Sequence, residues 1–287
     1  MKIGFIGQGY IGKNYANDFE NRGFKVIRYS LEKEYIGNKE KIKGCDIVFV
    51  AVPTPTTPRG FDDSIVTSAM SLIGNGKIAV IKSTLLPGIT KKIQKKYPKV
   101  FILHSPEFLS RGTASYDAAH PIVNIVGMPR NNGEYKDRAK KLLSILPKSS
   151  SKIVSSETSE FFKYVHNTSL FVRGVYMNLL YDLAKSLNVE WQDVKDLIIL
   201  DPMIAFQDSV VAKWHIDPVR KEGRGIGGNC HIKDFEALSR LYKKNVKDKI
   251  GEKIIDSLKK KNISLLTESK KDIPLIRGVY GKRILKK

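Results

Sequence analysis

Cysteine is scarce in this chain, with only Cys45 and Cys230 in 287 residues. Two cysteines cannot form the disulfide framework of a small secreted domain, so we expect a reducing compartment. The N-terminus leads straight into Lys2-Ile3-Gly4-Phe5-Ile6-Gly7, without a basic segment followed by a long apolar run. No stretch is apolar enough to span a membrane. These absences predict a cytoplasmic protein without membrane contact.

Acidic residues are too few to balance the basic ones, since 50 Lys+Arg face 29 Asp+Glu and give a formal charge of +21. A basic surface can serve nucleic acid, anionic lipid or anionic small substrates. The basic clusters are spread along the chain, and aromatic residues are not regularly interleaved with them as base stacking requires. We therefore do not expect nucleic-acid binding, and we interpret most of the excess charge as solvated surface. We expect no metal site either.

The first 30 residues carry a glycine motif between a predicted strand and a predicted helix. The strand covers residues 2–7, the helix runs to about Arg22, and a second strand covers residues 24–29. Gly7 allows the tight turn, Gly9 lets the backbone approach a pyrophosphate, and Gly12 lets the helix pack closely on the strand. This context predicts a dinucleotide cofactor, with contacts from Gly7, Gly9, Tyr10, Ile11 and Gly12.

The choice of cofactor depends on the end of the second strand. A carboxylate that holds the ribose hydroxyls is expected there, and this chain has Ser30. Serine can hydrogen-bond a ribose but does not repel a 2′-phosphate. Arg28 and Lys33 could attract that phosphate, while Glu32 opposes it. We expect NAD and leave NADP open.

Further turns follow the later predicted strands. The apolar run from Asp46 to Val52 is typical of a buried parallel strand, and the loop Pro53-Thr54-Pro55-Thr56-Thr57-Pro58 after it should expose its hydroxyls. Ligands bind at the carboxyl ends of such strands, so we expect cofactor contacts from Val52, Pro53, Thr54, Ser83 and Thr84. Cys45 is interpreted as a packing residue. Alternating strands and helices predict a doubly wound α/β sheet, Rossmann-like, over residues 1–155.

The segment from Glu157 to Leu187 predicts one long helix with apolar residues on more than one face. Such a helix is buried from several sides, which a homodimer partner could provide. Lys163 and Asn167 share a face of this helix; taken alone, that pair is typical of a solvated polar stripe. We expect a mostly helical domain over 156–245, with an irregular region from Trp214 to Arg224, and a short helix with a basic tail over 246–287.

A glycine-rich stretch precedes the second cysteine. Gly225, Gly227 and Gly228 lead into Cys230, and the apolar spacing after it is helical. This places Cys230 at or just before a helix N-terminus, where the helix dipole favours a thiolate. Asp234 would face the same side one turn later. On this stretch alone, a reactive nucleophile and a buried structural cysteine both stay open.

Together, these motifs resemble the UDP-glucose/GDP-mannose dehydrogenase family. The resemblance covers residues 1 to about 260 and depends on six pieces in one order. They are Gly7-x-Gly9-x-x-Gly12, Val52-Pro53-Thr54-Pro55, Lys82-Ser83-Thr84 with Pro87-Gly88, Ser105-Pro106-Glu107-Phe108-Leu109 with Gly112, Lys163-x-x-x-Asn167, and Gly227-Gly228-Asn229-Cys230 with Lys233-Asp234.

The resemblance implies a Rossmann domain, a dimerising helical domain, and NAD-dependent four-electron oxidation of a nucleotide sugar's C6 alcohol to a carboxylate. Cys230 would form a thiohemiacetal and then a thioester, while fixed donors stabilise the oxyanions. Asp234 would assist proton transfer, and Thr84 and Glu107 would position a water or act as base during hydrolysis. The implied catalytic residues are Cys230, Lys163, Asn167, Asp234, Thr84 and Glu107; Lys233 would lie near the cofactor; the implied substrate contacts are Glu107, Phe108, Leu109, Lys163, Asn167, Gly227 and Gly228.

The chain also departs from the family pattern. We expect no counterpart of the family's C-terminal UDP-binding domain. The chain has Asn229 where serine is usual, His231-Ile232 where an aromatic and a proline are usual, and Ile122-Val123 where Asp-Arg is usual. Two alternatives stay open. One is a two-electron β-hydroxyacid-type dehydrogenase, which needs no thiol. The other is a non-catalytic or partner-dependent nucleotide-binding protein.

Overall fold

The computed structural model describes residues 1–202, 204 and 216–285. It divides into two compact units, Met1–Pro55 with Phe61–Lys163 and Thr56–Gly60 with Tyr164–Lys287. The division falls inside the long helix α7 rather than at the expected 155/156 boundary. Within the described residues, no helix combines the length and the apolar character needed to cross a bilayer.

The first unit is built on a seven-stranded sheet in the order β2-β1-β3-β6-β7-β8-β9. Every neighbouring pair is parallel except β7 and β8, which pair antiparallel. This confirms the predicted Rossmann-like α/β fold. The strands are β1 (Lys2–Ile6), β2 (Lys25–Tyr29), β3 (Ile47–Val50), β6 (Ile78–Ile81), β7 (Phe101–His104), β8 (Asn124–Met128) and β9 (Ser151–Ser155).

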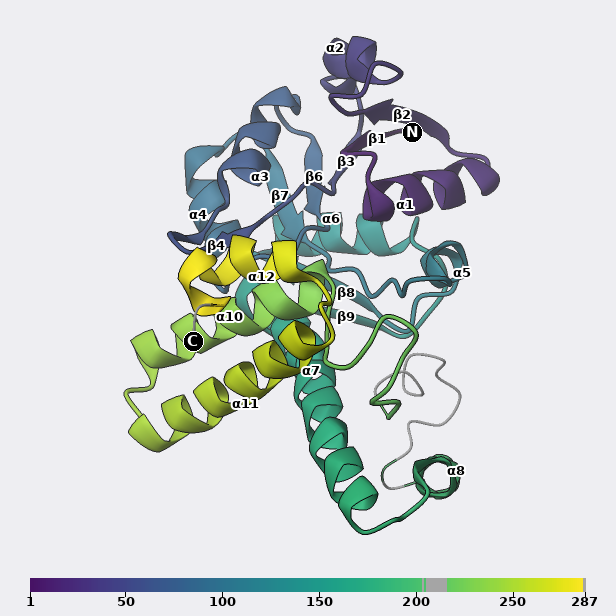
Figure 1. Cartoon of the computed structure of the whole chain (residues 1–287). Helices are drawn as coiled ribbons and strands as arrows, with labels where there is room; N and C mark the ends of the chain where they lie inside the picture. Colours follow the sequence, from purple (N-terminus) through teal and green to yellow (C-terminus); the bar gives the residue numbers. More distant parts are fainter. Residues whose placement is uncertain (203, 205–215, 286–287) are drawn as a thin grey trace. The chain divides into compact units, whose positions relative to one another are not determined.

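Helices cover both faces of this sheet because alternate strand residues point to opposite sides (Figure 1). Ile47 and Phe49 join a core with α1 and α6, whereas Val48 and Val50 join a second core with α3 and α4. The helical segments are α1 (Tyr10–Asn21), η1 (Ile36–Asn38), α2 (Lys39–Ile42), α3 (Ser64–Ala69), η2 (Met70–Leu72), α4 (Ile89–Lys96), α5 (Ala114–Ala119) and α6 (Gly133–Leu143). A strand buried on both faces explains the unbroken apolar run in the sequence.

The proline-rich loop after β3 differs from its prediction. It leads into two short strands, β4 (Thr56–Thr57) and β5 (Gly60–Phe61). The expectation of exposed hydroxyls was wrong for Thr54 and Thr56, whose side chains are buried. The hydroxyl of Thr54 donates a hydrogen bond of 2.8 Å to the carbonyl of Thr84, so it fastens the loop to the end of β6.

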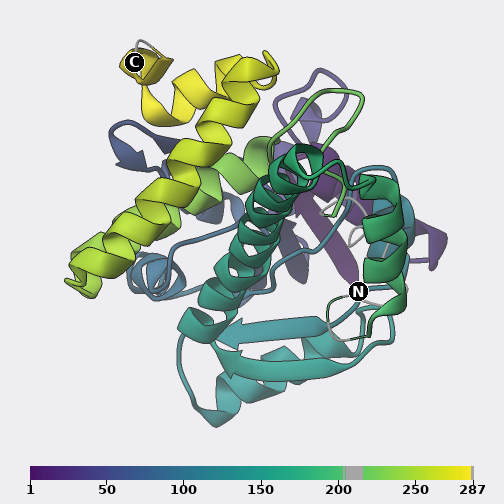
Figure 2. The ribbon, with the colours of Figure 1, turned by 60° about the horizontal axis from the view of Figure 1, so that its bottom comes forward.

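The second unit is helical, and its helices are α7 (Ser156–Ser186), α8 (Trp191–Leu200), α10 (Asn229–Asn245), α11 (Lys249–Glu268), α12 (Ile273–Tyr280) and η3 (Lys282–Leu285). Helix α7 has 31 residues, and it is one continuous helix (Figure 2), as predicted. Of the predicted irregular region from Trp214 to Arg224, Trp214 and residue 215 lie outside the described residues, and residues 216–224 contain only the bridge between Arg220 and Gly223.

The C-terminal segment is more ordered than predicted. In place of a short helix and a basic tail, α11 has 20 residues and α12 follows it. Apolar residues of both helices form a cluster with Ile232 of α10, and the cluster comprises Ile232, Ile263, Leu266, Ile276 and Val279. The lysines conceal this spacing in the sequence because they occupy the solvated faces of the same helices. Lys286 and Lys287 lie outside the described residues.

Candidate functional site

The glycine turn after β1 has the geometry that a dinucleotide pyrophosphate needs. Gly7 has a φ of 92°, and a Cβ there would overlap the carbonyl of Ala51. A Cβ on Gly12 would overlap the carbonyl of Gly7, so both glycines are required by packing. A Cβ on Gly9, the N-cap of α1, would meet nothing within 4 Å. Open space therefore lies before the positive end of α1, and this fits NAD.

The end of β2 favours ribose hydroxyls over a 2′-phosphate more than the sequence suggests. The hydroxyl of Ser30 accepts a hydrogen bond of 3.2 Å from the N–H of Glu32. Arg28 forms an ion pair of 2.6 Å with Glu20 and donates to Asn17 over 2.7 Å. Its charge is thus largely neutralised, which leaves it less able to attract a phosphate.

A buried charge cluster follows β6 and β7. The Nζ of Lys163, which is 3% exposed, lies 3.1 Å from Oε1 of Glu107 and donates to the Glu107 carbonyl over 2.5 Å. Burial raises the pKa of Glu107, but the charge of Lys163 and the N–H of Leu109 outweigh burial and lower it overall. Glu107 is therefore ionised at neutral pH. Removing either partner would leave a buried charge, at a cost of about 3–5 kcal/mol.

Lys82 is a second buried cation in this cluster, and its role was missed in the sequence. Its Nζ donates to the hydroxyl of Ser105 over 3.3 Å and lies 4.3 Å from the ring centre of Tyr15. Burial lowers the pKa of Lys82 to about 8, the charge of Glu107 opposes this, and the charge of Lys163 adds to it. Two lysines and one carboxylate leave this buried cluster with excess positive charge, which favours an anion.

Helix α7 holds the turn after Thr84 through Glu160. One carboxylate oxygen of Glu160 accepts from the backbone N–H of Gly88 over 2.6 Å, and the other accepts from the N–H and hydroxyl of Thr90 over 2.7 and 2.6 Å. These donors belong to the start of α4, so Glu160 caps that helix from another element. In the sequence, the available signal was the position of Glu160 one turn before Lys163.

His104 connects the end of β6 to the same helix. Its Nε2 lies 3.3 Å from the carbonyl of Ser83, which can only accept, so Nε2 carries the hydrogen. Its Nδ1 then accepts from the hydroxyl of Ser159 over 2.8 Å. Burial lowers the pKa of His104 to about 3, and the imidazole is neutral. The first turns of α7 thus fix both strand ends, and they do so through Ser159, Glu160 and Lys163.

The remaining residues expected in this unit lie around these strand ends. The hydroxyl of Ser83 donates to the carbonyl of Val52 over 2.7 Å and accepts from its N–H over 3.0 Å. The hydroxyl of Tyr10 donates to the carbonyl of Ser110 over 2.5 Å. The ring centre of Phe108 lies 6.0 Å from that of Phe162. Thr84 and Glu107 are buried, and Pro53 is exposed.

In the second unit, Cys230 is the second residue of α10, as predicted, and it is exposed. No disulfide joins it to Cys45, which is buried. One turn later, Asp234 is fully buried and accepts from the amide of Asn167 over 2.7 Å and from Lys233 over 2.6 Å. The structure therefore brings α7 and α10 together through two predicted site residues. The stacked rings of Phe171 and Phe235, with centres 3.9 Å apart, reinforce this contact.

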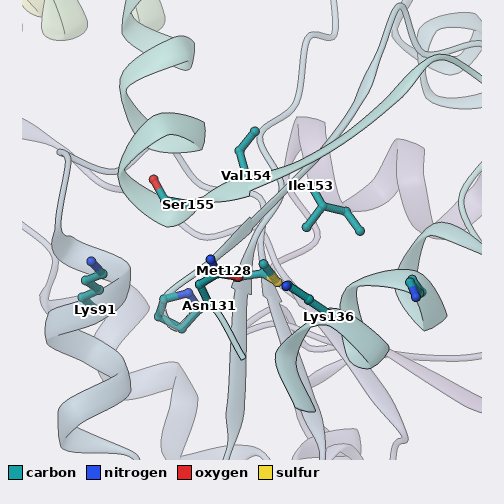
Figure 3. Close-up of a pocket in the computed structure, with 9 residues that line it drawn as sticks. Lys91, Met128, Asn131, Lys136, Ile153, Val154 and Ser155 are labelled. Carbon is teal, nitrogen blue, oxygen red and sulfur yellow. The ribbon is translucent and has the colours of Figure 1, made fainter. Parts of the chain in front are cut away.

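The first unit also has a pocket that lies away from the predicted site residues. Figure 3 shows Lys91, Lys136 and Ser155 around it. None of its nine lining residues is a predicted site residue. Among the residues that the structure describes, no group of three or more His, Cys, Asp or Glu is placed to hold a metal ion.

Comparison with known proteins supports the family resemblance found in the sequence. Residues 28–145 match the NAD binding domain of the UDP-glucose/GDP-mannose dehydrogenase family, and residues 157–263 match its central domain. The chain is 27% identical to a UDP-glucose 6-dehydrogenase of Rickettsia bellii, covering 91% of this chain and 67% of that protein. It is 28% identical to a UDP-glucose 6-dehydrogenase of Campylobacter jejuni, covering 98% and 77%.

Solved structures share the fold. A UDP-D-ManNAc dehydrogenase of Pyrococcus horikoshii aligns with a TM-score of 0.75 at 21% identity, over 93% of this chain and 69% of that one. The chain thus spans about two thirds of the length of several relatives that it matches. The two family matches together cover most of the chain. The chain therefore belongs to the UDP-glucose/GDP-mannose dehydrogenase family of NAD-dependent oxidoreductases.

Proposed function

We propose that this protein oxidises the C6 alcohol of a nucleotide sugar to a carboxylate, in two steps of two electrons each. The proposal assigns the cofactor to the glycine turn of the first unit and the nucleophile, Cys230, to the second. Several relatives act on UDP-glucose according to their names, and one solved relative acts on UDP-D-ManNAc. UDP-glucose is thus the type substrate to test first, and N-acetylated UDP-sugars are the next candidates.

The observation that carries this proposal is the hydrogen bond between Asn167 and Asp234. It links α7, which also bears Lys163, to α10, which bears Cys230. A two-electron dehydrogenase has no use for a thiol at this place. Cys230 is exposed at a helix start, beside a buried carboxylate and a fixed amide, and this arrangement suits covalent capture of an aldehyde.

The chemistry follows from these groups. NAD, bound at the glycine turn, supplies the hydride acceptor. After the alcohol becomes an aldehyde, the thiolate of Cys230 adds to the carbonyl carbon, and the carbonyl oxygen takes the electron pair. Lys163 and Asn167 are the donors that stabilise this oxyanion. Loss of a second hydride leaves a thioester, and water then breaks the C–S bond to give a carboxylate and the free thiolate. Ionised Glu107 can orient that water.

The test is the stoichiometry of reduced cofactor to consumed substrate, measured with the purified chain and a panel of nucleotide sugars. We expect a ratio of two and a carboxylate product. Cys230→Ala should abolish net four-electron turnover and leave NAD affinity within about 1 kcal/mol of the parent. Cys230→Ser should stall as an ester, because an alkoxide leaves less readily than a thiolate.

The matched control is Cys45→Ala, which removes the other, buried thiol and should keep the ratio of two. A ratio of one, or full activity of Cys230→Ala, would favour the two-electron β-hydroxyacid-type alternative. NAD binding without turnover of any nucleotide sugar would favour the partner-dependent nucleotide-binding alternative.

We also propose that the protein forms a homodimer through α7. Four apolar residues at helical spacing on this helix are exposed, and they are Val172, Tyr176, Leu179 and Leu183. Val172 and Tyr176 also line a mostly apolar groove with Phe235, Leu238 and Leu258 of α10 and α11. A second copy of this surface would cover apolar area that the second unit leaves in water.

A further inference from the structure

The carboxylate of Asp272 lies at the N-terminus of the helix that bears Cys230. Its Oδ2 accepts a hydrogen bond of 2.8 Å from the N–H of Gly228, which is the N-cap of α10. A Cβ on Gly227 would overlap the same oxygen. The carboxylate therefore occupies the space that a side chain at position 227 would take, and the start of α10 already has a negative charge against it.

The bond from Gly228 to Asp272 is one of several hydrogen bonds between the glycine-rich turn and the C-terminal helical segment. Side chains of α11 and of the turn after it bond the backbone of residues 224–228 almost one by one. The bonds join Arg224 N to Ser269 Oγ (2.8 Å), Gly225 O to Lys271 Nζ (3.1 Å), Ile226 N and O to the amide of Asn262 (2.7 and 2.9 Å), and Gly228 N to Asp272 Oδ2 (2.8 Å). The turn before Cys230 is thus shaped by residues more than 30 positions later in the chain.

Asp272 itself is held firmly. It is the N-cap of α12 and has a φ of 54°, a left-handed conformation that aspartate tolerates better than most residues. Helix α12 packs on α10 through Ile276, Val279 and Ile232 (Figure 1). The carboxylate therefore stays near the start of α10 instead of swinging into solvent.

Within the second unit, other charged groups also surround this helix start. Burial and the charge of Arg220 lower the pKa of Lys271, whereas the charges of Asp272 and Glu222 oppose this. His231 lies with Nδ1 3.2 Å from the carbonyl of Gly227, and Lys233 pairs with Asp234 one turn into the helix. Asp234 is already paired with Lys233 and Arg224 with Asp182, whereas Asp272 and Lys271 both bond the backbone of the glycine turn directly.

We propose that Asp272 is a positioning residue that holds the turn before Cys230 and, through its charge, restrains ionisation of the Cys230 thiol. A thiol that stays largely protonated resists oxidation and alkylation while no aldehyde is present. This benefit to catalysis rests on the proposed function, whereas the effect on the thiol does not. Asp272 thus opposes the helix dipole that favours the thiolate.

The test is the pH dependence of alkylation by iodoacetamide, which reports Cys230 because Cys45 is fully buried. Asp272→Asn keeps an acceptor for Gly228 and removes the charge. It should move the alkylation midpoint to lower pH by about 0.2 to 0.7 unit, the size of a charge–dipole effect at a helix end. Lys271→Met should move the midpoint to higher pH.

Asp248→Asn is the matched control. Asp248 is also an aspartate whose carboxylate accepts from a backbone N–H at a helix start, that of α11, but it follows the C-terminal end of α10 and so lies at the opposite end of that helix from Cys230. This substitution should leave the midpoint unchanged. In 1 M salt, the difference between the parent and Asp272→Asn should shrink, because the Debye length falls to about 3 Å. Asp272→Ala should give the same shift with a lower melting temperature.

An unchanged midpoint in both Asp272→Asn and Asp272→Ala, or a shift to higher pH, would overturn the proposal. A shift that 1 M salt leaves intact would overturn the role of charge. Because alkylation needs neither NAD nor substrate, failure of the dehydrogenase assay would leave this result readable.

Discussion

Replacing Lys82 by methionine should stabilise the protein at neutral pH, although it removes a residue of the buried charge cluster. Lys82 is 4% exposed, and burial lowers its pKa from 10.5 to about 8. The shift of about 2.5 units corresponds to about 3 kcal/mol of lost stability when the group is protonated. Losing the long hydrogen bond to Ser105 offsets about 1 kcal/mol. Lys82→Met should therefore gain about 2 kcal/mol at pH 7.

The gain should depend on pH with a definite sign. Between pH 8 and 10.5 the unfolded chain holds a proton that the folded chain has released, so the stability of the parent rises with pH. The penalty from Lys82 is complete below pH 8 and disappears as the pH rises toward 10.5. The advantage of Lys82→Met should accordingly fall from about 2 kcal/mol at pH 7 to near zero at pH 9.5.

Urea unfolding of the parent and of Lys82→Met at pH 7, 8.5 and 9.5 measures both quantities. Lys92→Met is the control, because the Lys92 side chain is 66% exposed and pairs with Asp63 at the surface. It should change stability by less than about 0.5 kcal/mol at each pH. If Lys82→Met is destabilising at pH 7, or if its advantage persists at pH 9.5, the charge of Lys82 is compensated in the fold and the reasoning fails.

Three further predictions concern other parts of the chain. Glu160→Gln should cost about 1–2 kcal/mol in thermal unfolding, since its amide would face one of three donors at the start of α4; equal stability would contradict the capping role. Ser30→Asp should widen the preference for NAD by weakening NADP, measured as the ratio of the two kcat/KM values, and a parent that already excludes NADP by several orders of magnitude would show that Ser30 does not decide it. Leu179→Glu should convert a dimer to a monomer in light scattering, whereas Leu31→Glu, at an even more exposed leucine of the first unit, should not; a monomeric parent would reject the dimer.

Prediction from the sequence worked where the signal is local. The strand, glycine turn and helix at the N-terminus, the long helix α7 and the helix start at Cys230 were all expected, and the structure confirms each of them. Each of these elements is signalled by apolar residues and glycines that lie within a few positions of one another in the sequence. The family followed from six such local pieces in one order, and the family matches confirm it.

Prediction failed where burial depends on distant packing. Thr54 was expected to be exposed, but it is buried because its partner is the carbonyl of Thr84, which belongs to another strand end. The C-terminal segment was expected to be a short helix with a basic tail, because its many lysines obscure a sparse apolar spacing. That spacing becomes meaningful only when α11 and α12 pack on Ile232 of α10. Neither error could be avoided without knowing which elements meet.

The sequence alone therefore determined the class of the fold, the cofactor type and the position of Cys230 at a helix start, because turn chemistry and periodicity are properties of neighbouring residues. Only the tertiary structure paired Lys163 with Glu107 across 56 residues and left Lys82 buried beside them. It alone placed Asp272 against the start of α10, across 44 residues. Such pairs are set by how helices and strand ends pack, and the charge around a reactive group depends on them.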